Sequence, residues 1–204
     1  MRNDLTQLTD LLKPYFKPNS FMEVGSREGK DTQFVHKYWN LKSSDCHIIE
    51  ADKISYEKIK SSYPDFNIYN VAASNENGEI EFLSVVSDNE LIRGISSIKK
   101  SLHVDNLEYE KYIVETIRLD KFDFPIDLMK IDVEGHGYEV LQGLGDKINK
   151  IKAIQIETES KVCFENQKVD ADINKLLLDK GFALVDKKPC WDFQFDCLYV
   201  NRKL

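Results

Sequence analysis

The sequence is poor in several features that define large classes of protein. No apolar run approaches the ~20 residues that a membrane-spanning helix needs, and residues 1–13 contain no apolar core of the signal-peptide kind. We therefore expect a cytoplasmic protein without a membrane span. The cysteines lack CxxC spacing, which favours free thiols over a zinc site; they are Cys46, Cys163, Cys190 and Cys197.

Positive charge is also in deficit. The 204 residues contain 28 Lys and Arg against 35 Asp and Glu, a net charge of −7. This balance disfavours broad binding to nucleic acid, which needs a positive field. No repeat, low-complexity tract or linker interrupts the chain. With 42% hydrophobic residues it can bury one sizeable core, so we expect residues 1–204 to form a single domain.

What the sequence does contain is a regular alternation of apolar strands and amphipathic helices. This alternation predicts an α/β fold, a doubly wound sheet with helices on both faces. An N-terminal helix within residues 1–18 is expected to pack on that domain. Turn residues 75–78 predict a hairpin between the strand before them and an exposed strand at 79–83. The other strands are expected at residues 21–24, 46–50, 66–73, 112–119, 126–131, 151–157, 182–185 and 195–200.

The stretch from Asp127 to Leu144, DLMKIDVEGHGYEVLQGL, places two acids at the end of a buried strand. Asp132 and Glu134 follow the apolar residues directly, before Gly135 and the helical spacing begin. Open α/β sheets bind their ligands at the carboxyl ends of the strands, so both acids are candidates for a functional site. Acids near a helix start also favour the positive end of its dipole, and a purely structural role stays open.

A strand, a tight turn and a helix are expected over residues 21–32, FMEVGSREGKDT. Gly25 lets the chain turn sharply beside a ligand, Gly29 lets the helix start close to the sheet, and the N–H groups of the turn can face an anion. The G-x-x-x-G spacing differs from the dinucleotide-binding G-x-G-x-x-G. Glu50 ends the next strand, where an acid can accept ribose hydroxyls. Glu23, before the turn, suits a cationic amino group, which favours S-adenosylmethionine over NAD.

These stretches resemble the FkbM family of methyltransferases over roughly residues 20–160. The resemblance rests on IDLMKIDVEG followed by xxxEVLxG, on VAxSNxxGxIEF and on GISSIKKS. It implies the class I methyltransferase fold, with seven strands of which the last is antiparallel, and S-adenosylmethionine as cofactor. Arg27 departs from the small polar residue common in relatives, and Glu23 replaces a commoner Asp. The cofactor-binding residues expected are Glu23, Gly25, Ser26, Arg27, Gly29, Thr32, Glu50, Ala51, Asp52, Val71, Ala72, Ser74 and Asp132.

Residues 84–112 are the least regular part of the chain. Long loops in compact domains are often lids or binding loops, so we interpret this segment as a candidate acceptor-side loop. A solvated surface excursion is the alternative. The substrate-binding candidates in it are Ser96, Ser97 and His103.

Family members that this chain resembles methylate hydroxyls of sugars, glycolipids and polyketide-type products. The resemblance thus implies an O-methyltransferase acting on a sugar, a glycan or a related small molecule. A hydroxyl acceptor must lose its proton as it attacks. Asp132 and Glu157, on strands expected to be neighbours, could also hold a divalent cation, or could bond to loop amides instead. The catalytic candidates are Asp132, Glu134, His136 and Glu157.

Other functions stay open at this point. One is N-methylation of a small amine or a protein, and another is a non-catalytic binding module that keeps the fold. Methylation of nucleic acid is disfavoured by the acidic charge. The expected partner is a small-molecule or glycan acceptor, and the sequence leaves open whether the chain forms a homodimer.

Overall fold

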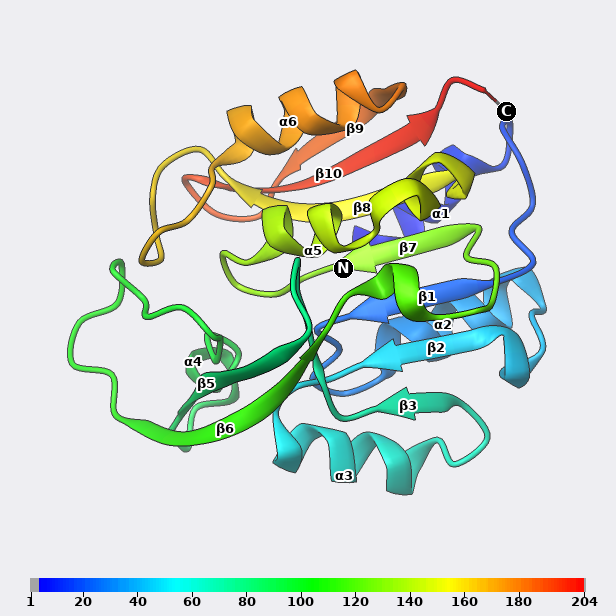
Figure 1. Cartoon of the computed structure of the whole chain (residues 1–204). Coiled ribbons are helices and arrows are strands. Elements are labelled where there is room, and N and C mark those ends of the chain that lie inside the picture. The colour runs from blue at the N-terminus through cyan, green and yellow to red at the C-terminus, as the bar shows by residue number, and fades with distance from the viewer. Residues whose placement is uncertain (1–3, 204) are drawn as a thin grey trace.

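The computed structural model describes residues 4–203. Its centre is a seven-stranded sheet in the order β3-β2-β1-β7-β8-β10-β9 (Figure 1). Its strands are parallel, except that β10 runs antiparallel to both β8 and β9. The predicted doubly wound sheet, with its last strand antiparallel, is therefore confirmed. The strands are β1 (Phe21–Val24), β2 (Cys46–Ile49), β3 (Asn67–Tyr69), β7 (Leu128–Ile131), β8 (Ala153–Glu159), β9 (Phe182–Pro189) and β10 (Gln194–Asn201).

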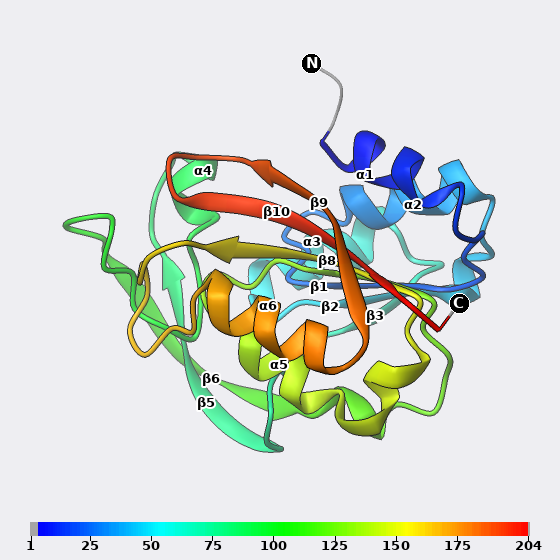
Figure 2. The same cartoon turned by 90° about the horizontal axis from the view of Figure 1, so that it is seen from above.

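Alternation of side chains along the strands divides the core between the two faces of the sheet. Met22 and Val24 join one buried cluster, with residues of α5 and α6, whereas Phe21 joins a second cluster, with residues of α1 and α2. Figure 2 shows these two pairs of helices on opposite sides of the sheet. The helices are α1 (Asp4–Leu12), α2 (Lys30–Trp39), α3 (Lys53–Ser62), α4 (Glu90–Arg93), α5 (Gly137–Gly143) and α6 (Asp170–Asp179), with 3-10 turns at Ser43–Asp45, Leu119–Lys121 and Gly145–Lys150.

The predicted N-terminal helix corresponds to α1, whose Leu5 and Leu12 are buried against the sheet. Residues 1–3 of that predicted segment, and residue 204, lie outside the described residues.

A second, three-stranded sheet has the order β4-β6-β5. Its strands are β4 (Ala72–Ala73), β5 (Gly78–Val85) and β6 (Tyr109–Ile117). Two predictions are wrong here. The single strand expected at 66–73 is split between the two sheets, because the Asn70 side-chain amide donates to the carbonyls of Glu50 and Ala51 and the chain then leaves the main sheet. The hairpin expected around 75–78 does not form, since β5 pairs with β6, and β6 lies between β4 and β5.

The predicted loop at 84–112 is shorter than expected at both ends. Its first residues continue β5, and its last residues begin β6, which pairs with β5 from Gly78 to Val85. Between the two strands lie α4 and a bridge in which Ser97 pairs with Leu83. The segment therefore folds back along the small sheet, beside the carboxyl ends of the main strands (Figure 1).

Candidate functional site

A cavity of about 490 Å³ opens at the carboxyl ends of β1, β2, β7 and β8, between the main sheet and the 91–98 segment. This volume lies in the range of small-molecule sites. Most of the residues predicted from the sequence line it. They are Gly25, Ser26, Arg27, Glu50, Ala51, Asp52, Val71, Ala72, Ser96, Ser97, Asp132, Glu134, His136 and Glu157. The predicted residues that do not line it are Glu23, Gly29, Thr32, Ser74 and His103.

Glu50 fixes the glycine turn from the tip of β2. Its Oε2 accepts hydrogen bonds from the backbone N–H groups of Ser26 at 3.1 Å and Arg27 at 2.6 Å. Its Oε1 accepts one from the N–H of Asp52 at 2.7 Å. Burial raises the pKa of Glu50 to about 7. The sequence led us to expect that N–H groups of the turn face an anion, and those of Ser26 and Arg27 are bonded to Glu50.

Gly25 is required by a close approach of two backbones. Its φ is +79°, and a Cβ at this position would lie 1.8 Å from the carbonyl oxygen of Asp132. The turn and the tip of β7 thus pack backbone against backbone, which only glycine permits. This contact places the turn and the acid of the DVEG segment on the same cavity.

Glu23 lies behind the cavity wall instead of facing it. Its Oε2 accepts from the N–H of Thr32 at 3.0 Å and from its hydroxyl at 2.5 Å, at the start of α2. Burial raises the pKa of Glu23 to about 8, against the opposing effect of the Lys130 ammonium. Lys130 Nζ in turn lies 2.5 Å from Asp31 Oδ2 and 3.2 Å from Asp132 Oδ2.

Three carboxylates converge on the floor of the cavity. Oxygens of Asp132, Glu134 and Glu157 all lie within 4.8 Å of one another. Burial, reinforced by the negative charge of Asp132, raises the pKa of both Glu134 and Glu157 well above its usual value. The side-chain amide of Gln194 donates to Glu157 at 2.7 Å. A raised pKa makes a carboxylate a stronger proton acceptor when it is in its ionised form.

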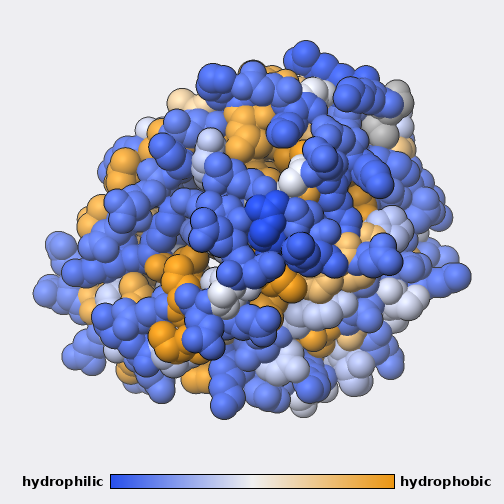
Figure 3. All heavy atoms as spheres, in the orientation of Figure 1, coloured by the Kyte–Doolittle hydropathy of each residue, from blue (hydrophilic) through white to orange (hydrophobic). Residues whose placement is uncertain are grey.

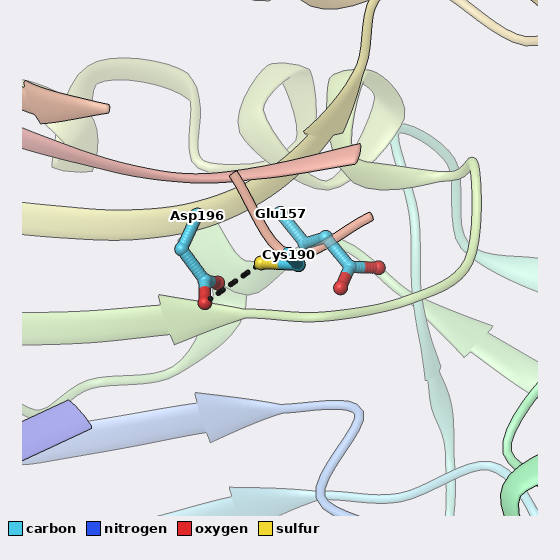
Figure 4. A group of neighbouring side chains, drawn as sticks. All are labelled: Glu157, Cys190 and Asp196. Carbon is cyan, nitrogen blue, oxygen red and sulfur yellow. Dashed lines mark hydrogen bonds between the residues drawn. The ribbon is translucent and has the colours of Figure 1, made fainter. Parts of the chain in front are cut away.

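Glu157 also belongs to a neighbouring group at the join of β8, β9 and β10. Its carboxylate, Cys190 Sγ and a carboxylate oxygen of Asp196 lie within 4.8 Å of one another (Figure 4). The thiol donates to Asp196 Oδ2 at 3.2 Å. Because the thiol already has this partner, and burial raises its pKa, Cys190 is held in its protonated form beside the acids.

The backbone that carries Glu134 is held in an unusual conformation. Glu134 has φ +47° and Gly135 has φ +84°, and a left-handed non-glycine residue costs on the order of 1–3 kcal/mol. Ser97 Oγ donates to the carbonyl of Glu134 at 2.8 Å, and the Phe164 ring packs where a Cβ on Gly135 would stand. The 91–98 segment therefore holds the loop that carries Glu134 in place.

His136 is buried, and both of its ring nitrogens are near protein groups. Nε2 lies 3.1 Å from Ser74 Oγ, and Nδ1 lies 3.4 Å from Glu139 Oε2. Lys99 Nζ pairs with the other oxygen of Glu139 at 2.9 Å. Burial lowers the pKa of His136 to about 3, so its imidazole is neutral and a weak base at physiological pH.

His103 lies away from the cavity, in the contact between two loops. Its Nδ1 is 3.1 Å from the carbonyl of Cys163, and its ring meets Phe164 and Phe193 edge to face. The rim of the cavity instead carries two exposed apolar side chains, Leu91 and Trp191. On the face shown in Figure 3 the surface is mostly hydrophilic, with hydrophobic side chains in separate patches.

Sequence reasoning did not assign several residues that line the cavity. Lys130 could have been noticed, because a lysine two residues before Asp132 interrupts an otherwise apolar strand and must point the same way as that acid. The remaining ones had no local signal, since their position depends on how distant loops meet. They include Asp31, Leu91, Arg93 and Gln194.

Comparison with known proteins places this chain in a family. A family model described as the methyltransferase FkbM domain matches residues 23–184. Because the match covers most of the chain, the chain belongs to the FkbM methyltransferase family, as the sequence motifs predicted.

Solved structures agree on the fold. The methyltransferase FkbM from Methylobacillus flagellatus KT has a TM-score of 0.61 at 13% identity, and the match covers 90% of this chain and 44% of that one. Magnesium protoporphyrin IX methyltransferase from Synechocystis PCC 6803, with SAM bound, has a TM-score of 0.56 at 10% identity, covering 96% and 76%. This chain thus spans less than half the length of the Methylobacillus protein. No curated protein matches it, and no helix within residues 4–203 is long and apolar enough to cross a membrane.

Proposed function

We propose that this protein is a cytoplasmic methyltransferase that transfers a methyl group from S-adenosylmethionine to a hydroxyl of a sugar, a glycan or a related small molecule. The observation that carries this proposal is the group of acids at the strand tips. Asp132, Glu134 and Glu157 line the same cavity as Glu50 and the glycine turn. A hydroxyl needs a proton acceptor when it attacks, and these acids supply one.

The cavity residues fit the proposed cofactor. Glu50 lies at the tip of β2 and faces the cavity, where its carboxylate can accept hydroxyl hydrogens of a ribose. Val71 and Ala72 provide a small apolar wall at the end of β3, suited to a planar base. The cofactor supplies an activated methyl group on sulfur; the chain supplies orientation, exclusion of water and a proton acceptor.

Among the four catalytic candidates, we propose that a carboxylate accepts the proton of the acceptor hydroxyl. Glu134 and Glu157 have raised pKa values, whereas that of His136 is lowered to about 3. His136 Nε2 also lies 3.1 Å from Ser74 Oγ, within hydrogen-bond distance, whereas its buried Nδ1 has no hydrogen-bond partner within residues 4–203. We therefore propose that Glu134 or Glu157 takes the proton and that His136 positions the loop. The sequence left Asp132, Glu134, His136 and Glu157 open as catalytic candidates, and this proposal chooses among them.

The same three carboxylates could instead hold a divalent cation, which would acidify the acceptor hydroxyl. Oxygen ligands from Asp132, Glu134 and Glu157 lie close enough together to share one ion. This version predicts activity that falls with a chelator and returns with Mg²⁺ or Mn²⁺. Activity indifferent to chelation would leave proton transfer as the role of these acids.

The acceptor is tested by incubating the protein with isotopically labelled S-adenosylmethionine and a panel of sugars, glycolipids and amines. We expect label on hydroxyl oxygen, and we expect Glu134→Gln and Glu157→Gln to lower turnover by about 10²-fold or more while leaving cofactor affinity intact. Glu115→Gln, on the exposed face of β6, is the matched control. Label found only on nitrogen would favour N-methylation, and cofactor binding without transfer to any acceptor would favour a binding module.

A further inference from the structure

The proposed cofactor carries two opposite charges at its methionine end, an ammonium and a carboxylate, and the carboxylate needs a hydrogen-bond donor. The glycine turn does not offer the expected ones. The N–H groups of Ser26 and Arg27 donate to Glu50, that of Gly29 donates to Ser26 Oγ at 3.0 Å, and that of Thr32 donates to Glu23. A donor must therefore come from elsewhere in the cavity.

Lys130 is placed to be that donor. It stands in β7 directly opposite Glu23 of β1, and it lines the cavity although its side chain is only 12% exposed. Its ammonium has three N–H groups, and the acceptors it meets within residues 4–203 are two, Asp31 and Asp132. One N–H group therefore remains for a ligand.

We propose that Lys130 binds the carboxylate of the methionine part of S-adenosylmethionine, while Asp31 and Asp132 beside it face the ammonium. This inference rests on the proposed function, because it assumes that the cavity binds this cofactor. A largely enclosed ammonium next to the carboxylates of Asp31 and Asp132 matches a ligand group that carries both a negative and a positive charge. The carboxylates of Asp31 and Asp132 lie against the Lys130 ammonium, at 2.5 Å and 3.2 Å, and balance its charge inside the cavity.

Other cations at the cavity are less suited to this role. Lys30 is 70% exposed and pairs with Glu28 at 2.6 Å. The Arg27 guanidinium packs against Gly94, where a Cβ would come within 2.9 Å of its Nη1, so it leans toward the 91–94 segment at the mouth. Lys130, with only 12% of its side chain exposed, lies near the tips of β1 and β7, where Gly25 brings the turn against Asp132.

The experiment compares two ligands that differ only in the methionine part. Calorimetric titration is carried out with S-adenosylhomocysteine and with 5′-methylthioadenosine, which lacks the amino and carboxyl groups. The proteins are wild type, Lys130→Met and Lys152→Met. Lys152 is the matched control, because it also forms a partly buried ion pair, with Asp127 at 3.1 Å, at the opposite end of the strands.

We expect Lys130→Met to weaken the binding of S-adenosylhomocysteine by about 10- to 100-fold, the range for a hydrogen bond to a charged group. The same variant should change the affinity for 5′-methylthioadenosine by less than about 3-fold. Lys152→Met should bind both ligands with the affinity of the wild type. Equal losses for the two ligands would show that Lys130 only maintains the fold of the site, and no loss for either would refute the inference. If wild type bound neither ligand, the cofactor proposal itself would fail, and this inference with it.

Removing Lys130 leaves Asp31 and Asp132 unpaired, so folding of each variant is checked by circular dichroism. If Lys130→Met does not fold, the affinities for the two ligands are compared in Lys130→Gln, which is neutral but keeps an N–H donor. A measurement on the unaltered protein gives an independent test. Wild type should bind S-adenosylhomocysteine at least about 10-fold more tightly than its decarboxylated analogue, and equal affinities would contradict a carboxylate subsite.

Discussion

Replacing Gly25 by alanine tests the backbone contact on which the site is built. The new Cβ would lie 1.8 Å from the carbonyl oxygen of Asp132, so the turn or the tip of β7 must move by more than about 1 Å to restore a normal contact. Overpacking of this kind costs about 1–3 kcal/mol. The left-handed φ of +79° costs about 1–2 kcal/mol more for alanine. We therefore expect a loss of about 2–5 kcal/mol.

Gly181→Ala is the matched control, because Gly181 has a similar φ of +91° but open space around it, with Lys203 Cε at 3.9 Å as its nearest neighbour. It should show the conformational part alone, about 1–2 kcal/mol. Both variants are compared with wild type by urea unfolding, followed by circular dichroism. If Gly25→Ala cost no more than Gly181→Ala, the close packing of the turn against β7 would not be what requires glycine.

Two further predictions concern buried charge. The pKa values of Glu50 and Glu159 are raised by burial to about 7, so the folded protein keeps protons that the unfolded chain loses above about pH 4.5. The free energy of unfolding should therefore fall as pH rises from about 5 to 8, by roughly 3 kcal/mol per carboxyl at most; urea unfolding across this range that showed rising stability would contradict it. Lys99→Met should cost about 3–5 kcal/mol, because it leaves the Glu139 carboxylate, only 18% exposed, without its cation. Lys175 pairs with Asp179 on the exposed surface, so Lys175→Met should lower the free energy of unfolding by less than about 0.5 kcal/mol. Similar losses in the two variants would refute the reasoning.

The parts of the fold that the sequence predicts well are those set by local chemistry. The apolar strand before Asp132, the glycine turn and the acid at Glu50 each follow from a few adjacent residues, and the structure places all three on one cavity. Parallel strands bring their carboxyl ends together, so motifs far apart in sequence meet without further information.

The parts that were missed depend on contacts between distant segments. The split of the strand at 66–73 follows from Asn70 reaching the carbonyls after β2, which no periodicity records. His103 has no pattern that distinguishes a cavity residue from one packed between Phe164 and Phe193. Glu23 was placed on the correct strand, but its position opposite Lys130 became apparent only from the register of β1 with β7.

The most direct test of the central claim is calorimetric titration of the wild-type protein and Glu50→Ala with S-adenosylhomocysteine, with Glu115→Ala as the control for loss of an exposed glutamate. The account predicts saturable binding to wild type and to the control, weakened by about 10-fold or more in Glu50→Ala, because the carboxylate accepts from the ribose and holds the turn. Equal affinity in all three proteins would remove Glu50 from the cofactor site. No binding to wild type would contradict the assignment of this cavity to S-adenosylmethionine.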